Sequence, residues 1–515
     1  MRGPHHDEAV ATRKLPGLSA ETALVVGLIA LGTALRVQGI TSHPLWIDEY
    51  GSWWAVAGDG LAELWRRVLT VHGQSPFFYG IVNASVGALG PTPLALRLPS
   101  LVFGIALLAL ALPLAQAAFG DRRSAIAALA AFAVNERLIF YSQEARPYAL
   151  ALFCAGLSCL AWLALLREPR SVRARAAYLL TTAACFYAHY LFGVLVLVHA
   201  VHWLVSRPQR ADLGSWLATA GLLMALLTPG AFQLADLFGR REILDWVEPN
   251  APLQLLGSYF DPAVLAWTAG TALLAVIVAR GVNLPTSRAG TGFVVLWLAV
   301  PFLVITLLPP LFGISLLDRR YLAVALPAAP LLYGVLIALP ARNAWLPLLV
   351  FLVASMALSL APRYEATGLF SARYRGEHWD RAVQALRKGQ QPGDPIFYAT
   401  HFVELDAVVL GQASDDDREF SVWPVAAHLP PERRSSLRAL PYRDSAEMLP
   451  ALESRLDEAS RVPRSWVIGK QPVIAQFIRM AVRRKGVDVV AHQRFGRIYL
   501  IQLRGRVDGG LTEPR

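Results

Sequence analysis

The 515-residue sequence is poor in charge, with only 17% of its residues Asp, Glu, Lys or Arg and 55% hydrophobic. Soluble domains carry about 25% charged residues, so an ordinary soluble enzyme is excluded. Lysine is nearly absent, and Arg therefore carries the net charge of +11. A basic balance often indicates nucleic-acid binding, but here the Arg residues stand between apolar runs, as in membrane proteins. We expect a membrane protein without a nucleic-acid partner.

Cysteine is also scarce. The three Cys residues all lie inside apolar segments, which excludes a disulfide framework and a cysteine-based zinc cluster. The sequence further lacks a glycine-rich phosphate loop ending in Gly-Lys-Ser/Thr, a Gly-x-Ser-x-Gly elbow and a His-Glu-x-x-His motif. No carboxylate falls near the centre of an apolar stretch, where a proton-coupled transporter would need one. ATP-driven and proton-coupled transport therefore find no support.

Apolar stretches of nearly membrane-spanning length recur along the first two thirds of the chain. They predict a mainly α, polytopic membrane protein with about 11 transmembrane helices. The first stretch has no small-residue cleavage site after it, which favours an uncleaved signal anchor over a signal peptide. The predicted spans are residues 21–40, 94–118, 124–142, 147–167, 176–190, 191–206, 212–232, 263–281, 291–309, 321–340 and 344–361.

Basic residues predict the orientation, because Lys and Arg gather in cytoplasmic loops. Alternate connections place residues 1–20 in the cytoplasm, multiple spans in the inner membrane, and the C-terminal residues on the periplasmic or extracellular side. Counting 76–90 as a further span would reverse this arrangement and put the Arg-rich loops outside. The predicted cytoplasmic set is Arg2, Arg13, Lys14, Arg122, Arg123, Arg167, Arg170, Arg173, Arg175, Arg207, Arg210, Arg280, Arg288 and Arg342.

Three regions lie outside the membrane in this scheme. Residues 41–93 form a long, Trp-rich first external loop, in which 76–90 is predicted as an interfacial or re-entrant helix. Residues 233–262 form a second external loop, and the transmembrane domain as a whole covers 21–361. Residues 362–515 are predicted as a small external α/β domain. Its expected elements are helices at Trp379–Lys388 and Ile474–Arg484 and strands at Pro395–Ala399, Ser465–Ile468 and Arg497–Leu503.

Acidic residues are rare between 21 and 361, so those beside the external face are candidates for chemistry. Asp48 and Glu49 follow the first span, where a carboxylate pair can act as a general base or bind a divalent cation. A helix N-terminus that favours acids explains them equally well. Glu144 and Arg146 lie in Tyr141–Tyr148, at the outer end of the third span. The alternative there is a short polar turn.

Two Arg pairs break the positive-inside tendency on the predicted outer face. Arg319 and Arg320, followed by Tyr321, open the tenth span, and Arg240 and Arg241 lie in the second external loop. Guanidinium groups suit phosphate geometry, so a phosphate ester or an anionic lipid headgroup would explain them. Ordinary phospholipid binding is the alternative for both pairs.

Histidines and one acidic run are less informative. His189-Tyr190 lies at an outer turn, where a lone His is more often structural. His199 and His202 have metal-like spacing but lie near the inner end without an acid, so packing is the preferred interpretation. The run Asp415–Asp417 resembles a cation site, but a charge run in a soluble domain is usually a solvated loop, and the loop is the preferred interpretation.

Several short motifs, taken in order, resemble the C-type glycosyltransferases that use polyprenyl-phosphate sugars. The nearest branch contains the protein O-mannosyltransferases, the aminoarabinose-lipid A transferases and the Rgt-like galacturonosyltransferases. The resemblance covers roughly residues 20–340. Its motifs are Asp48-Glu49, His72–Tyr79, Leu96–Pro99, Tyr141–Tyr148, His189-Tyr190 and Arg320-Tyr321.

The resemblance implies a role for each matched position. Asp48 matches the catalytic acid, Glu144 the acidic position of a second external loop, and Arg320 a basic position near the donor phosphate. The family often has two Pro after the His that matches His72, whereas this chain has Gly-Gln-Ser-Pro. Substrate binding is expected of His72, Gln74, Arg146, Tyr148, His189 and Tyr190, catalysis of Asp48, Glu49 and Glu144, and phosphate binding of Arg319, Arg320, Tyr321 and Arg241.

The sequence thus predicts a membrane glycosyltransferase that moves a sugar from a polyprenyl-phosphate donor to an envelope lipid, glycan or protein. Neither a cofactor nor a metal is assigned, although Asp48 and Glu144 permit a divalent cation. The other partners are membrane lipids. A lipid-linked sugar transporter or flippase should show repeats or broken midplane helices, which the sequence does not indicate. A non-catalytic envelope scaffold would leave Asp48, Glu144 and Arg320 unexplained.

Overall fold

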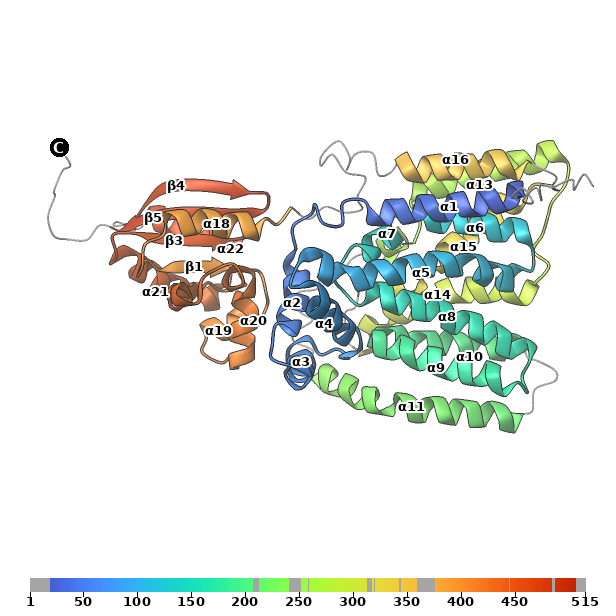
Figure 1. The fold of residues 1–515 in the computed structure, drawn as a ribbon, viewed down its shortest axis with the longest axis horizontal. Coiled ribbons are helices and arrows are strands. Elements are labelled where there is room, and N and C mark those ends of the chain that lie inside the picture. Colours follow the sequence, from blue (N-terminus) through green and yellow to red (C-terminus); the bar gives the residue numbers. More distant parts are fainter. Residues whose placement is uncertain are drawn as a thin grey trace, which may run out of the picture.

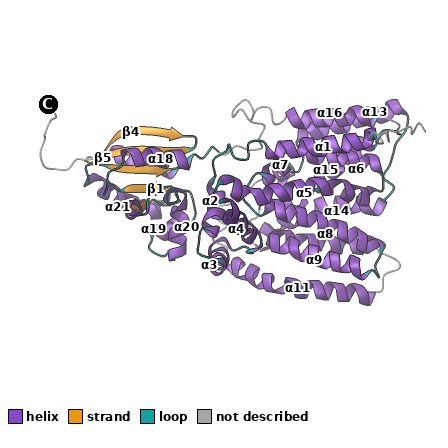
Figure 2. Cartoon of the chain, viewed as in Figure 1, coloured by secondary structure: helices purple, strands orange, loops and turns teal. Residues whose placement is uncertain are grey.

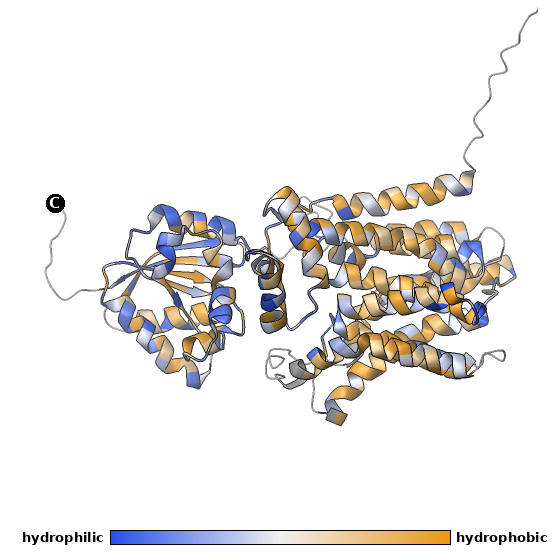
Figure 3. Cartoon of the chain, turned by 60° about the horizontal axis from the view of Figure 1, so that its bottom comes forward, coloured by the Kyte–Doolittle hydropathy of each residue, from blue (hydrophilic) through white to orange (hydrophobic). Residues whose placement is uncertain are grey.

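The protein consists of a helical bundle and a smaller mixed sheet, with a few short helices lying between them (Figures 1 and 2). Hydrophobic residues predominate along the helices of the bundle, and hydrophilic residues are more frequent in the sheet domain (Figure 3). The computed structural model describes residues 19–206, 213–239, 252–257, 259–312, 317–318, 320–341, 344–358, 376–443, 445–483 and 487–505.

Each predicted span corresponds to a helix or a closely spaced helix pair, and the polytopic membrane architecture is confirmed. Six of the helices are at least 18 residues long and apolar enough to cross a bilayer by themselves. The helices that match the eleven predicted spans, in order, are α1 (Ala20–Val37), α5 (Pro93–Phe119), α6 (Arg122–Val134) with α7 (Glu136–Ser142), α8 (Tyr148–Arg167), α9 (Val172–Ala188), α10 (Val194–Ser206), α11 (Leu213–Gly239), α13 (Pro262–Ala279), α14 (Arg288–Phe312), α15 (Ala328–Ala338) and α16 (Trp345–Leu358).

Small residues bring the central helices together. Helix α6 is rich in Ala, and almost its whole length is buried. A Cβ at Gly32 of α1 would lie 2.9 Å from the Cα of Ala133, and one at Gly334 of α15 would lie 2.6 Å from the backbone oxygen of Ser124. Lipid gives little hydrophobic drive for helix association, so close backbone approach supplies the packing energy. Helix α6 therefore packs closely against both α1 and α15.

A bend in the third predicted span carries the chain toward the site. Helices α6 and α7 meet at an angle of 58°. Asn135 lies at the break, and its side chain accepts hydrogen bonds from the amides of Arg137 and Leu138 that begin α7. Gln143 then donates to the backbone oxygens of Leu35 and Gln38, at the end of α1. The turn that follows Gln143 is thereby fixed against the start of the first external loop.

The first external loop folds into α2 (Ile47–Val56), α3 (Leu61–Arg67), a short π-helix (Val68–His72) and α4 (Phe77–Leu89). Helix α4 has 13 residues, about 20 Å at 1.5 Å per residue, which is shorter than the roughly 30 Å hydrocarbon core. Its length suits the interfacial or re-entrant helix that the sequence predicts. In Figure 1 helices α2, α3 and α4 lie between the bundle and the sheet domain.

The C-terminal region contains a five-stranded sheet of order β2-β1-β3-β5-β4. Strands β1 and β3 match the predicted strands and pair in parallel, while β5 pairs antiparallel with both β3 and β4. Helices α18 and α22 also match their predictions. The elements are α18 (Trp379–Gly389), β1 (Ile396–Ala399), α19 (Leu405–Val409), α20 (Asp415–Ala426), β2 (Leu437–Ala439), α21 (Leu449–Ser460), β3 (Ser465–Gly469), α22 (Val473–Arg483), β4 (Val487–Phe495) and β5 (Ile498–Gly505).

The sheet domain contacts the first external loop directly. Trp46 and Trp54 join Phe402 and Phe420 in one buried cluster. Arg66 forms an ion pair with Asp416. The interpretation of Asp415–Asp417 as a solvated loop is correct only in part. The side chain of Asp415 is fully exposed, but the three residues form the first turn of α20, capped by Ser414, and Asp416 pairs with Arg66 of α3.

Candidate active site

Asp48 is the second residue of α2 and lies beside Arg320. Its carboxylate Oδ2 is 3.6 Å from Nη1 of Arg320, and the two side chains are 24% and 29% exposed. The first external loop and the segment before α15 thus bring an acid and a guanidinium together from positions 272 residues apart (320 − 48). Both side chains are therefore partly accessible to a substrate.

Glu49 has a different environment from its neighbour, since it is 1% exposed and both carboxylate oxygens are engaged. Arg97 of α5 donates to Oε1 and to Oε2 at 2.6 Å each. The amide of Ala145 adds a bond of 2.9 Å to Oε1. Both oxygens of this buried carboxylate already accept hydrogen bonds, which disfavours their taking a proton from a substrate. These contacts suit a positioning role for Glu49 rather than the predicted catalytic role.

Arg97 also forms hydrogen bonds to the segment that follows α1. It is 3% exposed, and it donates to the backbone oxygens of Ile40, His43 and Pro44 at 2.6, 3.0 and 3.0 Å. The Arg97–Glu49 pair therefore connects α2, α5, the segment that follows α1 and the turn at Ala145. The sequence signals Arg97 only through the Leu-Arg-Leu-Pro motif, and its role as the partner of Glu49 was missed.

The predicted polar turn carries three of the candidate side chains. Glu144 is 4% exposed. Arg146 donates from Nη1 to the backbone oxygen of Asp48 at 3.4 Å, and Ser100 donates to the backbone oxygen of Arg146 at 3.2 Å. The ring of Tyr148 lies 5.3 Å from that of His189. The turn thus lies against the loop that bears Asp48.

His189 is buried between Tyr148 and Phe192. Burial and the nearby positive charge of Arg146 both favour a neutral imidazole. Its surroundings allow hydrogen bonding and ring stacking, but they disfavour a cationic role toward a phosphate.

Arg320 is oriented by a second carboxylate that the sequence prediction did not include. Asp318 accepts from the Arg320 backbone amide at 2.8 Å and from its Nε at 3.2 Å. Burial opposes the charge of Arg320, but the electrostatic effects of Tyr148, Asp48 and Asp318 outweigh it and raise the pKa of the guanidinium. Arg320 thus stays cationic throughout the physiological range.

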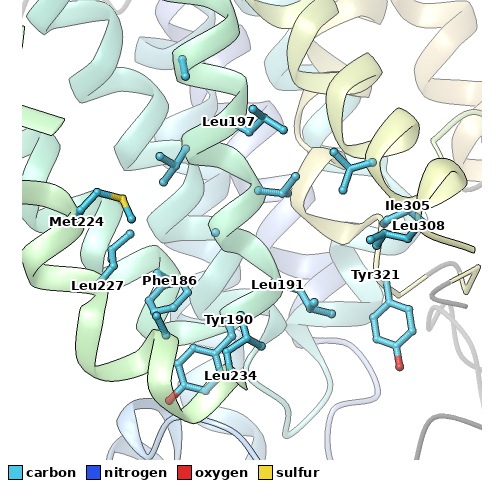
Figure 4. A pocket seen from close by; sticks show the side chains of 16 residues that line it. Phe186, Tyr190, Leu191, Leu197, Met224, Leu227, Leu234, Ile305, Leu308 and Tyr321 are labelled. Carbon is cyan, nitrogen blue, oxygen red and sulfur yellow. The ribbon is translucent and has the colours of Figure 1, made fainter. Parts of the chain in front are cut away.

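An apolar cavity of about 580 Å³ opens beside this segment. Tyr190 and Tyr321 line one end of it, and side chains such as Leu197 and Met224 line it farther along the bundle (Figure 4). The walls come from α10, α11 and α14, with residues Val194, Leu227 and Leu308 among them. Tyr321, which lines the cavity, follows Arg320 directly in the chain.

The loop before α4 lies near the same end of the cavity. Tyr190 donates a hydrogen bond to Gln233 of α11, whose amide donates to the backbone oxygen of Gln74 at 3.3 Å. Tyr79 donates to the side chain of Gln74 at 3.5 Å. The structure therefore brings Gln74 and Tyr190 together through Gln233, a residue that sequence reasoning missed.

Some predicted site residues lie outside the described part of the chain: Arg240, Arg241 and Arg319, together with the side chain of His72. Within the described ranges, no group of three or more His, Cys, Asp or Glu side chains gathers to hold a metal ion. A divalent cation held by Asp48 and Glu144 stays a prediction. His199 and His202 pack in an aromatic cluster with Trp162, as expected.

Comparison with known proteins supports the fold. No family model matches the chain, and no curated protein matches its sequence. Among solved structures, ArnT from Cupriavidus metallidurans matches with a TM-score of 0.56 and 12% identity, over 94% of this chain and 98% of that chain in the apo state. ArnT bound to undecaprenyl phosphate gives the same TM-score over 97% and 100%. The chain therefore shares the fold of ArnT. AglB from Archaeoglobus fulgidus, in complex with an inhibitory peptide and a dolichol-phosphate, also matches, with 12% identity, 96% and 75% coverage and a TM-score of 0.48.

Proposed function

We propose that this protein is a membrane glycosyltransferase that moves a sugar from a polyprenyl-phosphate donor to an envelope acceptor. The observation that carries the proposal is the pairing of Asp48 with Arg320, whose neighbour in the chain, Tyr321, lines an apolar cavity. An accessible acid, a permanent cation and a lipid-like space match the three parts of such a reaction: an acceptor proton, a donor phosphate and a polyprenyl tail. The fold shared with ArnT adds support.

The donor is placed with its tail in the cavity and its phosphate against Arg320. An isoprenoid chain suits walls such as Leu191, Leu227 and Ile305, because apolar burial favours it by about 0.8 kcal/mol per methylene. A guanidinium binds phosphate through paired hydrogen bonds. Asp48 and Asp318 both contact Arg320, and the donor phosphate would share the guanidinium hydrogens with them.

The transfer step is a substitution at the anomeric carbon. The acceptor hydroxyl oxygen bonds to that carbon while Asp48 takes its proton, which passes afterwards to solvent. The bond from the anomeric carbon to the phosphate oxygen breaks, and the polyprenyl phosphate leaves with the electron pair. Arg320 stabilises the negative charge that develops on it. Attack from the face opposite the phosphate would invert the anomeric configuration.

The surrounding residues hold this geometry. Glu49 and Arg97 fix the start of α2, and Arg146 fixes the backbone of Asp48. We place this site on the outer face of the cytoplasmic membrane, with the N-terminus cytoplasmic and the sheet domain outside, because that arrangement agrees with the distribution of Arg. The acceptor is an envelope lipid, glycan or protein.

Replacing Arg320 by Gln is expected to weaken binding of undecaprenyl phosphate by about 10- to 100-fold, since a hydrogen bond to a charged group contributes about 1.5–3 kcal/mol. Titration of the purified protein in detergent, followed by intrinsic Trp fluorescence, measures this affinity. Arg170→Gln removes an exposed Arg from a loop distant from the site and should leave the affinity unchanged. Equal affinity in Arg320→Gln and wild type would refute the phosphate assignment.

Replacing Ala200 of α10 by Trp is expected to fill the part of the cavity beyond Leu197 and to weaken undecaprenyl phosphate binding by about tenfold, through lost burial of a few methylenes at about 0.8 kcal/mol each. Binding of a short prenyl phosphate, whose chain ends before the blockage, should change less. Ala218→Trp, at an exposed position on helix α11, serves as the control. If both chain lengths lose affinity equally, the cavity does not hold the tail.

A further inference from the structure

Glu377 reaches the start of the helix that bears Asp48. It lies just before α18 in the sheet domain and is 2% exposed. Its Oε2 accepts a hydrogen bond of 3.0 Å from the backbone amide of Ile47, the first residue of α2. The two residues are 330 positions apart, so the second domain supplies this contact.

The contact satisfies a group that α2 cannot satisfy by itself. The first amides of a helix have no intrahelical acceptor, and a negative charge near them is favoured. Within α2, Glu49 accepts from the amide of Trp46 at 3.3 Å, which leaves the amide of Ile47 to Glu377. Asp48 follows Ile47 directly. The contact with Glu377 therefore holds the backbone one residue before the acid of the candidate site.

The carboxylate of Glu377 is itself held in place. Lys470 donates to Oε1 at 2.8 Å, and the indole of Trp379 donates to Oε2 at 3.4 Å. Lys470 follows β3, and its backbone amide donates to Ala399 at the end of β1. A buried carboxylate is tolerated when it is paired and hydrogen-bonded in this way. A continuous series of hydrogen bonds therefore leads from the end of β1 through Lys470 and Glu377 to the start of α2.

A second contact from the same domain reaches α2 one turn farther along. Tyr50 Oη and His428 Nε2 are 2.7 Å apart, in hydrogen-bond contact. His428 is partly buried, and burial lowers its pKa, which favours the neutral imidazole at physiological pH. Two side chains of the sheet domain, Glu377 and His428, thus form hydrogen bonds to helix α2 of the first external loop.

We propose that Glu377 is a positioning residue for Asp48 and that the sheet domain thereby completes the active site. The inference rests on the proposed transferase function. Displacing a catalytic group by about 1 Å can lower the reaction rate by about 100-fold. Loss of the hydrogen bond between Glu377 and the Ile47 amide is therefore expected to slow turnover by shifting Asp48. Donor binding depends on Arg320 and the cavity, so it should not require the contact that Glu377 makes.

The test compares Glu377→Ala and Glu377→Gln with wild type in the full-length protein. Hydrogen exchange of the peptide 46–56, followed by mass spectrometry, should be about tenfold faster in Glu377→Ala, because capping is lost. Sugar product in complemented cells should fall by about tenfold or more, while affinity for undecaprenyl phosphate stays unchanged. Glu377→Gln retains an oxygen that can accept from Ile47 and should lie between the two. Glu432→Ala, at an exposed position of the same domain, is the control.

The outcomes separate the two proposals. Unchanged exchange of peptide 46–56 in Glu377→Ala, with an active wild type, overturns the positioning role alone. Loss of undecaprenyl phosphate affinity in parallel with product also overturns it, since a general structural defect would then explain both. If wild type transfers no sugar while Glu377→Ala still loosens α2, the transferase function fails and the contact between domains stands. Should Glu377→Ala not fold, the exchange and product measured in Glu377→Gln decide in the same way.

Discussion

Sugar transfer should be abolished when Asp48 is replaced by Asn, with the protein still folded in the membrane. The substitution keeps the size of the side chain and removes its ability to accept the acceptor proton. General-base catalysis contributes typically about 10²–10⁴-fold, so product should fall by at least about 100-fold. Product is measured in the envelope of cells that carry the variant as their only copy, by mass spectrometry of the transferred sugar.

The matched control is Asp59→Asn, the same chemical change at an exposed position of the same external loop. It should leave product at the wild-type level. Undecaprenyl phosphate should still bind to Asp48→Asn, because Arg320 and the cavity remain. Product at the wild-type level in Asp48→Asn would remove Asp48 from the reaction.

Replacing Glu49 by Gln should strongly destabilise the folded protein. It leaves the 3%-exposed Arg97 without its carboxylate partner, and breaking such a buried pair costs about 3–5 kcal/mol. Unfolding of the purified protein with increasing SDS in mixed micelles gives the change in free energy of unfolding. Transfer should also decline, since Glu49 holds the start of α2.

An exposed ion pair provides the comparison for Glu49→Gln. Arg122 and Glu21 form a contact of 2.6 Å, with side chains 47% and 50% exposed. Exposed pairs contribute about 0–1 kcal/mol, so Glu21→Gln should change the free energy of unfolding by no more than that. If the two variants prove equally stable, the Arg97–Glu49 pair does not secure the loop.

The spans could be predicted because membrane burial acts on composition alone. A helix that faces lipid must be apolar along about 20 residues, and this pattern is visible without knowing any contact. Helices α5, α8 and α14 show it plainly, and each lies where it was expected. The bend between α6 and α7 was not predicted, because Asn135 interrupts the helix through local hydrogen bonds that leave hydropathy unchanged.

The site was only partly predictable, since a sequence shows which groups exist but not which of them are paired. Asp48 and Glu49 are adjacent and were both expected to act in catalysis. The structure separates them, with Asp48 accessible beside Arg320 and Glu49 buried on Arg97. The roles assigned to the predicted residues remain proposals, although several of those residues lie close together.

Contacts between domains were the least predictable feature. Glu377 stands in a stretch with no motif, and nothing in its neighbourhood indicates a partner 330 residues away. Asp416 was predicted to be solvated because charge runs usually are, and only the arrangement of α20 against α3 gives it Arg66. Such contacts depend on how two surfaces meet, which local composition does not encode.

The most direct test of the proposed transfer is mass spectrometry of the polyprenyl phosphates and of the envelope lipids, glycans and proteins in a deletion strain. We predict that one envelope sugar disappears, that its polyprenyl-phosphate form accumulates, and that the wild-type chain reverses both changes while Asp48→Asn reverses neither. An envelope that retains every sugar in the deletion strain, or full restoration by Asp48→Asn, would contradict the proposed transfer.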